Sequence, residues 1–277
     1  MSSTQLKSGK KSGVLITGAG RGIGKRLALG FAKAGARVGL LGRNQAELDS
    51  TRLEIEYAGG AALSLQADVC NADQIRDVVG EMTSLWGGID ALIACAGVLG
   101  PIGPFSSNRP EAWREVFDVN VYGVINCCHA VLPQMVKRRS GKILAISCVG
   151  VASPRPGFAV YSASKAAVAR FVESLAEEVR DNNVQVNSML PGGAYTSMTD
   201  EVLRAGNDID EAEIESAGQV RLTGGVPAEK QIQLALFLTS ERSNHVTGKL
   251  IQVQDDWKRL ENENGRPEAY TLRRHHR

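Results

Sequence analysis

Apolar runs rich in β-branched residues alternate along the chain with longer segments of helical period. The runs predict strands at 13–17, 37–41, 61–65, 89–94, 142–147, 184–190 and 249–254. The segments between them predict helices at about 22–34, 44–57, 72–86, 111–139, 159–180 and 226–239. Near-continuous apolar strands joined by helices indicate a parallel sheet with helices on both faces. We therefore expect an α/β fold, a doubly wound, Rossmann-type parallel seven-stranded sheet in a single domain over 1–277, with its core at 12–254.

One segment, 193–225, interrupts this alternation because it is polar, acidic and bounded by glycines. A long interruption inside a compact domain is more often functional than accidental, so we expect a substrate lid. Its many carboxylates are typical of a solvated face. Apolar positions that could line a pocket, or equally belong to the core, are Tyr195, Met198, Val202 and Ile214, with Leu99, Val151 and Phe158 elsewhere. A polar C-terminal tail, 255–277, follows the last strand.

The sequence TGAGRGIG (17–24) joins the first strand to the first helix and is rich in glycine. Glycines let the backbone approach a ligand, and the helix N-terminus offers free N–H groups to a pyrophosphate. A tight strand-to-helix turn would need glycines even without a ligand, but the βαβ context favours a dinucleotide site. The candidate cofactor-binding residues here are Gly18, Arg21, Gly22, Ile23 and Gly24.

The end of the second strand, LLGRN (40–44), is where a carboxylate would accept hydrogen bonds from the 2′-hydroxyl of NAD. This chain has no acid there until Glu47, and it has Arg43, whose guanidinium suits a phosphate. Arg21 could assist. The sequence therefore favours NADP(H), with NAD(H) as the alternative if Arg43 is only a solvated side chain.

Tyr161 and Lys165 stand one helical turn apart at the start of the helix that follows the fifth strand. The i,i+4 spacing places both side chains on one helix face. A free tyrosine has a pKa of about 10. A nearby ammonium and an oxidised nicotinamide both favour the phenolate, so we expect the pKa of Tyr161 to fall toward working pH. This pair is the candidate proton-transfer group.

With these motifs the chain resembles the short-chain dehydrogenase/reductase family, in its 3-oxoacyl-reductase-like branch, over about residues 12–254. The matching motifs are TGAGRGIG, ADV (67–69), ACAG (94–97), Asn120 in NVYG, YSASK (161–165) and PGGAYT (191–196). The resemblance implies an oxidoreductase that moves a hydride between NADP(H) and a carbonyl or secondary alcohol. Tyr161 and Lys165 would be catalytic, and Asn120 would hold a water that links Lys165 to solvent. It further implies cofactor contacts from Asp68, Val69, Cys95, Ala96, Gly97, Asn120, Tyr161, Lys165, Pro191, Gly192, Ala194 and Thr196.

Two positions depart from the family pattern. Cys95 stands where a second asparagine is usual, and Cys148 stands where the catalytic serine is usual, thirteen residues before Tyr161. A thiol is a weaker donor than a hydroxyl, and loss of one donor to a developing oxyanion can cost about 10²–10³ in rate. Three interpretations stay open: Cys148 acts as an adequate donor, Ser147 replaces it through a one-residue shift, or the chain binds cofactor and turns over slowly or not at all.

Charge and composition limit the kinds of partner and compartment that the sequence predicts. The net charge is +2 and the pI is about 8.3, so no global charge favours nucleic acid. No apolar run reaches the roughly 20 residues of a membrane span, and the polar N-terminus is not a signal peptide. The five cysteines form no CxxC pair, which is typical of reduced thiols in a cytoplasmic protein and gives no metal site.

The predicted substrate is a small neutral carbonyl or alcohol, because the acidic lid would disfavour anionic ligands if its carboxylates faced the pocket. The family resemblance implies a homodimer or homotetramer. Two rival functions are a non-catalytic NADP(H)-binding or scaffold protein, and an epimerase or dehydratase of the extended branch. The GxxxGxG spacing and the short chain argue against the second rival.

Overall fold

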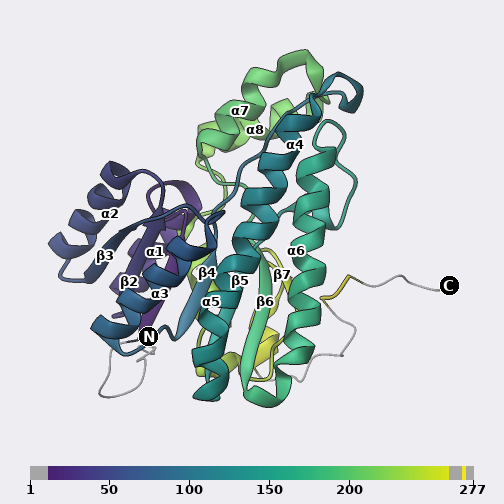
Figure 1. Ribbon diagram of the computed structural model, residues 1–277. Coiled ribbons are helices and arrows are strands. Elements are labelled where there is room, and N and C mark those ends of the chain that lie inside the picture. The colour runs from purple at the N-terminus through teal and green to yellow at the C-terminus, as the bar shows by residue number, and fades with distance from the viewer. Residues whose placement is uncertain (1–11, 262–269, 273–277) are drawn as a thin grey trace.

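A seven-stranded parallel sheet forms the centre of the computed structural model, which describes residues 12–261 and 270–272 (Figure 1). Its strands are β1 (Gly13–Thr17), β2 (Arg37–Gly42), β3 (Ala61–Gln66), β4 (Ala91–Ala94), β5 (Gly141–Ile146), β6 (Val184–Leu190) and β7 (Leu250–Gln252). The strand order is β3-β2-β1-β4-β5-β6-β7, and every pairing is parallel. The predicted doubly wound sheet is confirmed. The order reverses between β1 and β4, which is where ligands bind in such sheets.

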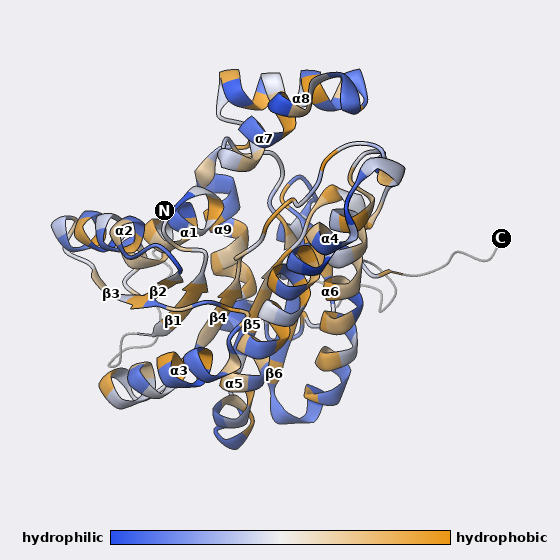
Figure 2. Ribbon diagram, turned by 45° about the horizontal axis from the view of Figure 1, so that its top comes forward, coloured by the Kyte–Doolittle hydropathy of each residue, from blue (hydrophilic) through white to orange (hydrophobic). Residues whose placement is uncertain are grey.

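Helices cover both faces of the sheet (Figure 2). One face carries α1 (Gly22–Lys33), α2 (Gln45–Tyr57) and α9 (Ala228–Leu238), and the other carries α3 (Ala72–Trp86), α5 (Gly123–Lys137) and α6 (Ala159–Glu178). Each face has its own cluster of buried apolar side chains. Because helices cover both faces, both sets of alternating strand side chains are mainly apolar, which explains the near-continuous hydrophobic runs.

The predicted helix over 111–139 contains a change of winding. It consists of α4 (Pro110–Phe117), a π-helical turn (Asp118–Tyr122) and α5, which follow one another without a break. π turns are rare and occur mainly at functional sites. This one carries Asn120, whose side chain is fully buried.

The stretch Pro110–Lys137 is also, within the described part of the chain, the one helix long and apolar enough to cross a membrane by length and composition. Half of its most apolar window is buried inside the protein. Its buried side chains include Val124, Cys127, Val131 and Met135, which belong to the core on the α3 side of the sheet. Packing in the core therefore accounts for its apolar composition.

The segment 193–225 forms two helices above the carboxyl ends of the strands (Figure 1). They are α7 (Ser197–Ala205) and α8 (Glu211–Thr223). A capping box between Thr196 and Thr199 starts α7. An antiparallel bridge between Ala194 and Gly225 closes the base of this segment, which we call the lid.

The folded core extends beyond residue 254, the boundary expected from sequence. A 3₁₀ turn at Trp257–Glu261 places Trp257 on Phe237 of α9, with ring centroids 5.3 Å apart, and Leu260 is buried too. Farther along, the carbonyl of Tyr270 accepts a hydrogen bond from the N–H of Leu250 in β7. The rest of the predicted tail lies outside the described residues.

Candidate active site

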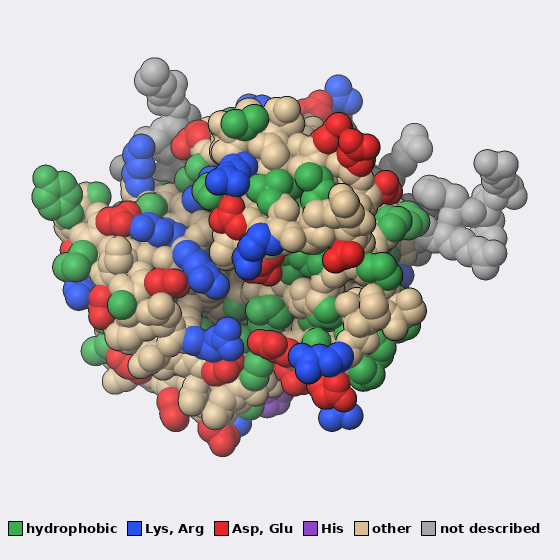
Figure 3. Space-filling model, turned by 90° about the horizontal axis from the view of Figure 1, so that it is seen from above, with side chains coloured by type: hydrophobic (Ala, Val, Ile, Leu, Met, Phe, Trp, Pro, Cys, Tyr) green, Lys and Arg blue, Asp and Glu red, His purple; other side chains and the backbone are tan. Residues whose placement is uncertain are grey.

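A cavity of about 790 Å³ opens at the carboxyl edge of the sheet, beneath the lid. Figure 3 looks onto this end of the molecule, where cationic and anionic side chains alternate around a hollow. The cavity brings together nearly all of the site residues predicted from sequence. They are Gly18, Arg21, Gly22, Ile23, Gly24, Arg43, Asp68, Val69, Cys95, Ala96, Gly97, Cys148, Tyr161, Lys165, Pro191, Gly192, Ala194 and Thr196. Asn120 lies behind the cavity wall instead.

The glycine loop is compact because its backbone is left-handed at two positions. Gly18 has φ +66° and Gly22 has φ +56°. A Cβ at Gly18 would lie 3.0 Å from the Cα of Ala96, and one at Gly22 would lie 3.0 Å from the methyl of Thr196 at the base of the lid. Arg21, the N-cap of α1, makes no side-chain cap, so N–H groups of the first turn are open to an anion.

Two arginines stand at the β2 side of the cavity. Arg43 is exposed, and its carbonyl accepts a hydrogen bond from Gln66 Nε2 at 2.9 Å, which fixes its backbone. Arg21 lies 3.5 Å from Glu47 Oε1, and its side chain is 68% exposed. A surface pair of this kind is worth little. Both guanidinium groups therefore stay accessible to a phosphate at this end of the cavity.

The ACAG turn after β4 is hydrogen-bonded to Thr17 of β1 and packs closely against Asn120 and Lys165. The hydroxyl of Thr17 accepts hydrogen bonds from the N–H groups of Cys95 and Ala96, both at 2.9 Å. A Cβ at Gly97 would lie 3.1 Å from Asn120 Oδ1 and 3.5 Å from Lys165 Nζ. The missing side chain of Gly97 thus lets this turn approach the two buried polar groups.

Asn120 holds the turn with its side chain. Its Oδ1 accepts from Val98 N at 2.9 Å, while Nδ2 donates to Val98 O at 2.9 Å and to Ser164 Oγ at 3.0 Å. These bonds link the π turn, the end of β4 and α6. The proton relay through Asn120 that the family resemblance implies stays a prediction.

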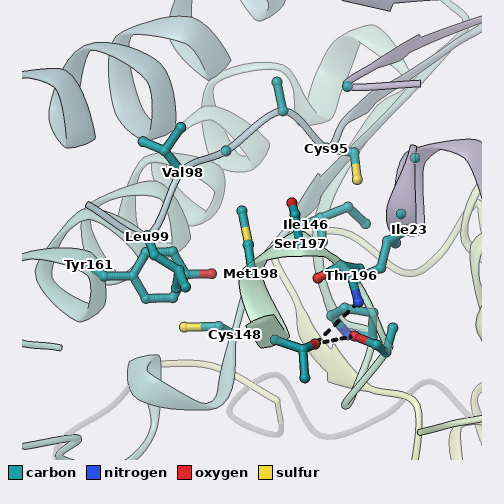
Figure 4. A pocket seen from close by; sticks show the side chains of 18 of the residues that line it. Ile23, Cys95, Val98, Leu99, Ile146, Cys148, Tyr161, Thr196, Ser197 and Met198 are labelled. Atoms are coloured by element: carbon teal, nitrogen blue, oxygen red, sulfur yellow. Dashed lines mark hydrogen bonds between the residues drawn. The ribbon is translucent and has the colours of Figure 1, made fainter. Parts of the chain in front are cut away.

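Tyr161 and Cys148 present their polar atoms to the same part of the cavity (Figure 4). Met198 of α7 and Leu99 lie beside them, within one apolar cluster. Burial raises the pKa of the Tyr161 phenol, and the neighbouring Cys148 raises it further, while Arg155 opposes the rise. Burial also raises the pKa of the Cys148 thiol. Both groups are therefore protonated, neutral donors at neutral pH.

Lys165 is buried, and its ammonium is hydrogen-bonded to the end of β5. Its Nζ donates to the carbonyl of Ile146 at 3.0 Å and lies 5.8 Å from the centroid of the Tyr161 ring. Burial lowers the pKa of Lys165. Burial has the largest effect on the pKa of the Tyr161 phenol and raises it, and the cation that opposes this rise is Arg155. The acidification expected from Lys165 together with an oxidised nicotinamide stays a prediction.

Ser147 and Cys148 have different surroundings. Ser147 continues the pleat beyond β5, donates its N–H to Met189 O at 2.8 Å and is 4% exposed. Its Oγ is buried and has no hydrogen-bond partner among the described residues. Cys148 precedes the 3₁₀ turn Val149–Val151 and lies against Tyr161. Both residues line the cavity, and the Cys148 thiol interacts with the phenol, whereas the Ser147 hydroxyl makes no hydrogen bond to it.

Sequence reasoning missed an ion pair that joins the lid to the loop before Tyr161. Arg155 donates from Nε to Glu213 Oε1 and from Nη2 to Glu213 Oε2, both at 2.7 Å. Its guanidinium carbon also lies 3.8 Å from the centroid of the Phe158 ring. Arg155 stands between two prolines, and nothing in the sequence pattern singled out its partner 58 residues later.

The lid contributes both charged and apolar side chains to the cavity. Glu213 and Asp210 line it, whereas most of the lid acids do not, as expected for a solvated face. Of the apolar candidates, three line the cavity, namely Met198, Val202 and Leu99. The other four, Tyr195, Ile214, Val151 and Phe158, do not. Tyr195 is 41% exposed and donates its hydroxyl to Asp200.

The sheet order, the glycine loop and the Tyr161–Lys165 pair define a class of protein, and comparison with known families agrees. The family model for short chain dehydrogenase matches residues 12–206. The chain therefore belongs to the short-chain dehydrogenase family. It is an oxidoreductase that acts on CH–OH groups with NAD(P).

Within this family the chain is similar to reductases and dehydrogenases of different substrates. The chain is 31% identical to a 3-oxoacyl-[acyl-carrier-protein] reductase of Staphylococcus aureus, over 86% of this chain and 95% of the relative. A 3-ketoacyl-ACP reductase structure from Sinorhizobium meliloti has a TM-score of 0.74 and 35% identity, covering 87% and 96% of the two chains. A gluconate 5-dehydrogenase structure from Burkholderia cenocepacia, in complex with NADP and tartrate, has a TM-score of 0.78 and 30% identity, covering 88% and 93%.

Proposed function

We propose that this chain is an NADP(H)-dependent carbonyl reductase, interconverting a carbonyl and a secondary alcohol, with Tyr161 as proton donor and acceptor. One observation carries the proposal: the Tyr161 hydroxyl points into the same cavity that the glycine loop lines. A dinucleotide held by that loop and a substrate facing Tyr161 would thus share one space. Two of the similar proteins support the cofactor and the reaction, since one is named as a reductase and the other was solved with NADP.

The residues present fit the dinucleotide. Gly18 and Gly22 leave backbone space at the start of α1, where the pyrophosphate would lie. Arg43 and Arg21 would take the 2′-phosphate that distinguishes NADP from NAD. Asp68 and Val69 would border the adenine, and Thr196 with Pro191 would border the nicotinamide. When bound, the nicotinamide supplies or accepts the hydride.

Tyr161 is the residue that transfers the proton to and from the substrate oxygen. Burial keeps the phenol protonated at neutral pH, and this is the state that carbonyl reduction uses. Tyr161 gives its proton to the carbonyl oxygen as the hydride reaches the carbon, and takes it back in alcohol oxidation. Cys148, also protonated, would donate a second and weaker hydrogen bond to that oxygen. Lys165 would hold the cofactor ribose.

Initial rates of NADPH and NADH consumption, across a panel of neutral ketones and 3-oxoesters, test this function. We expect NADPH to be preferred, and Tyr161→Phe to lower kcat by about 10²–10⁴, the usual contribution of a positioned general acid. Tyr57→Phe serves as the matched control, because Tyr57 is 97% exposed on α2. Turnover that survives Tyr161→Phe would refute the catalytic assignment. NADPH binding without turnover on any substrate would favour the rival scaffold function.

We also propose that the chain is a cytoplasmic homodimer or homotetramer. In support of the compartment, all five cysteines are free thiols. Exposed aromatic side chains on and before the α4–α5 helix, Phe105 at 56% and Tyr122 at 57%, offer contact surface for a second copy. Light scattering on a sizing column would reveal a monomer if the oligomeric proposal is wrong.

A further inference from the structure

An ion pair in the substrate half of the cavity joins two elements that lie far apart in the sequence. Arg155 lies in the loop between Cys148 and Tyr161, and Glu213 lies on α8 of the lid. Their bond is bidentate, with both N–O distances 2.7 Å, and the two side chains are 18% and 23% exposed. Such a geometry is the strong form of an arginine–carboxylate interaction.

The ion pair uses the edge of Arg155 that would otherwise recognise a carboxylate. Its Nε and Nη2 both donate to Glu213, and its flat face stacks on Phe158. A substrate carboxylate would have to leave water and displace Glu213, which would then lose its own partner. Removing a charge from water costs several kcal/mol unless a free counter-ion receives it.

Charges that line this half of the cavity also balance. Arg155 and Lys165 are the cations, and Asp210 and Glu213 are the anions, which sums to a formal charge of zero. Lys165 is committed to the carbonyl of Ile146 at 3.0 Å. The remaining lining is mainly apolar and includes Val98, Leu99, Met198, Val202 and Ala217. A neutral, partly apolar substrate meets no comparable penalty here.

We propose that Glu213 is a specificity-determining residue: by occupying Arg155, it restricts the pocket to neutral carbonyl substrates and excludes those that carry a carboxylate beside the reacting group. This inference rests on the proposed function and deepens it, because it names the charge class of the substrate. The pocket described here fits a neutral keto ester better than the corresponding keto acid.

A matched pair of ligands tests the inference directly. Methyl benzoylformate and benzoylformate share one ketone and differ by a single negative charge. Phenylacetate and its methyl ester differ in the same way, and carry no reducible ketone. For the first pair, we measure kcat/KM with NADPH. For the second pair, we measure Kd by ligand-observed NMR in the presence of NADP⁺. Each pair gives an independent ratio of the preference for the ester over the acid.

For the wild-type chain we expect the ester to be preferred at least 10-fold in both ratios. Glu213→Gln frees the positive charge of Arg155 and should shift both ratios toward the acid by about 10–100-fold, the scale of one desolvated charge pair. The double variant Arg155→Met with Glu213→Gln should return toward the wild-type preference. Glu215→Gln, at an exposed acid on the same helix, is the matched control and should leave both ratios unchanged.

Two outcomes overturn the inference. In the first, a folded Glu213→Gln variant, checked by its melting temperature, keeps the wild-type ratios. In the second, the wild type prefers the acids and Arg155→Met abolishes that preference, which would mean that Arg155 reads the carboxylate itself. Failure of the proposed function looks different: benzoylformate and its ester are not reduced at all, while the Kd ratios for the unreactive pair still decide the role of Glu213.

Discussion

Lys142 gives the sharpest prediction about stability, because a cationic side chain is buried far from the active site. It belongs to β5, is 8% exposed, and donates to Asn244 Oδ1 at 2.7 Å and to Ser243 Oγ at 3.4 Å. Burial lowers its pKa from 10.5 to about 7, and the attraction of Glu241 only partly offsets that effect. The folded chain therefore binds this proton much more weakly than the unfolded chain does.

The direction of the pH effect follows from that difference. Between about pH 7 and pH 10 the unfolded chain holds the proton and the folded chain does not, so the free energy of unfolding rises with pH in this window. One pKa unit corresponds to about 1.4 kcal/mol. Integrated from pH 7.0 to 8.5, the Lys142 contribution is about 1–2 kcal/mol, allowing a unit of uncertainty in its pKa.

Urea denaturation between pH 7.0 and 8.5 measures this contribution, with Lys142→Met as the perturbation. The range stops at 8.5 because burial also raises the pKa of thiols such as Cys127, which adds a slope of opposite sign at higher pH. We expect the variant to lose about 1–2 kcal/mol of the pH-dependent rise, whatever its absolute stability. Lys137→Met, at an exposed lysine, should keep the full rise. A Lys142→Met slope equal to that of the wild type would refute the reasoning.

Two further predictions concern the active site. Because a hydroxyl is a stronger donor than a thiol, Cys148→Ser should keep kcat or raise it by up to about 10²-fold, with little change in NADPH affinity. Cys148→Ala, which has no donor, should lower kcat. Steady-state kinetics measure both variants, and a large loss of kcat in Cys148→Ser would show a specific role for sulfur. Arg43→Asp should weaken NADPH binding by about 10-fold or more and favour NADH, measured by cofactor fluorescence titration, with Arg76→Asp on the exposed face of α3 as control. Unchanged NADPH affinity in Arg43→Asp would show that the 2′-phosphate is read elsewhere.

Local sequence patterns were sufficient to predict the strands of the sheet and the loop at the start of α1. The alternation of apolar runs and helical periods predicted all seven strands in parallel order, because a sheet covered on both faces needs apolar side chains on both sides of each strand. The glycine loop could be located because its left-handed positions, Gly18 and Gly22, admit glycine most readily. Most of the cofactor candidates then follow from the order of strand ends around the reversal between β1 and β4.

Other features could not be predicted from local sequence, because they depend on which distant groups meet. The winding of a helix around Asn120 depends on the bonds that its side chain makes with Val98 and Ser164. The lowered pKa of Lys142 depends on the surrounding residues that bury its side chain. The sequence of a strand does not show whether a lysine in it is buried. The continuation of the core to Trp257 depends on a ring of α9 that it covers.

The sequence by itself determined the sheet, the place of the dinucleotide cavity and the presence of Tyr161 and Lys165 on one helix face, since these follow from short-range periodicity and turn chemistry. Only the tertiary structure decided where the charges act. In the folded chain Lys165 donates a hydrogen bond to the carbonyl of Ile146. Arg155, paired with Glu213 of the lid, is the cation that opposes the effect of burial on the pKa of Tyr161. Electrostatic effects depend on distance and burial in three dimensions, which spacing along the chain does not contain.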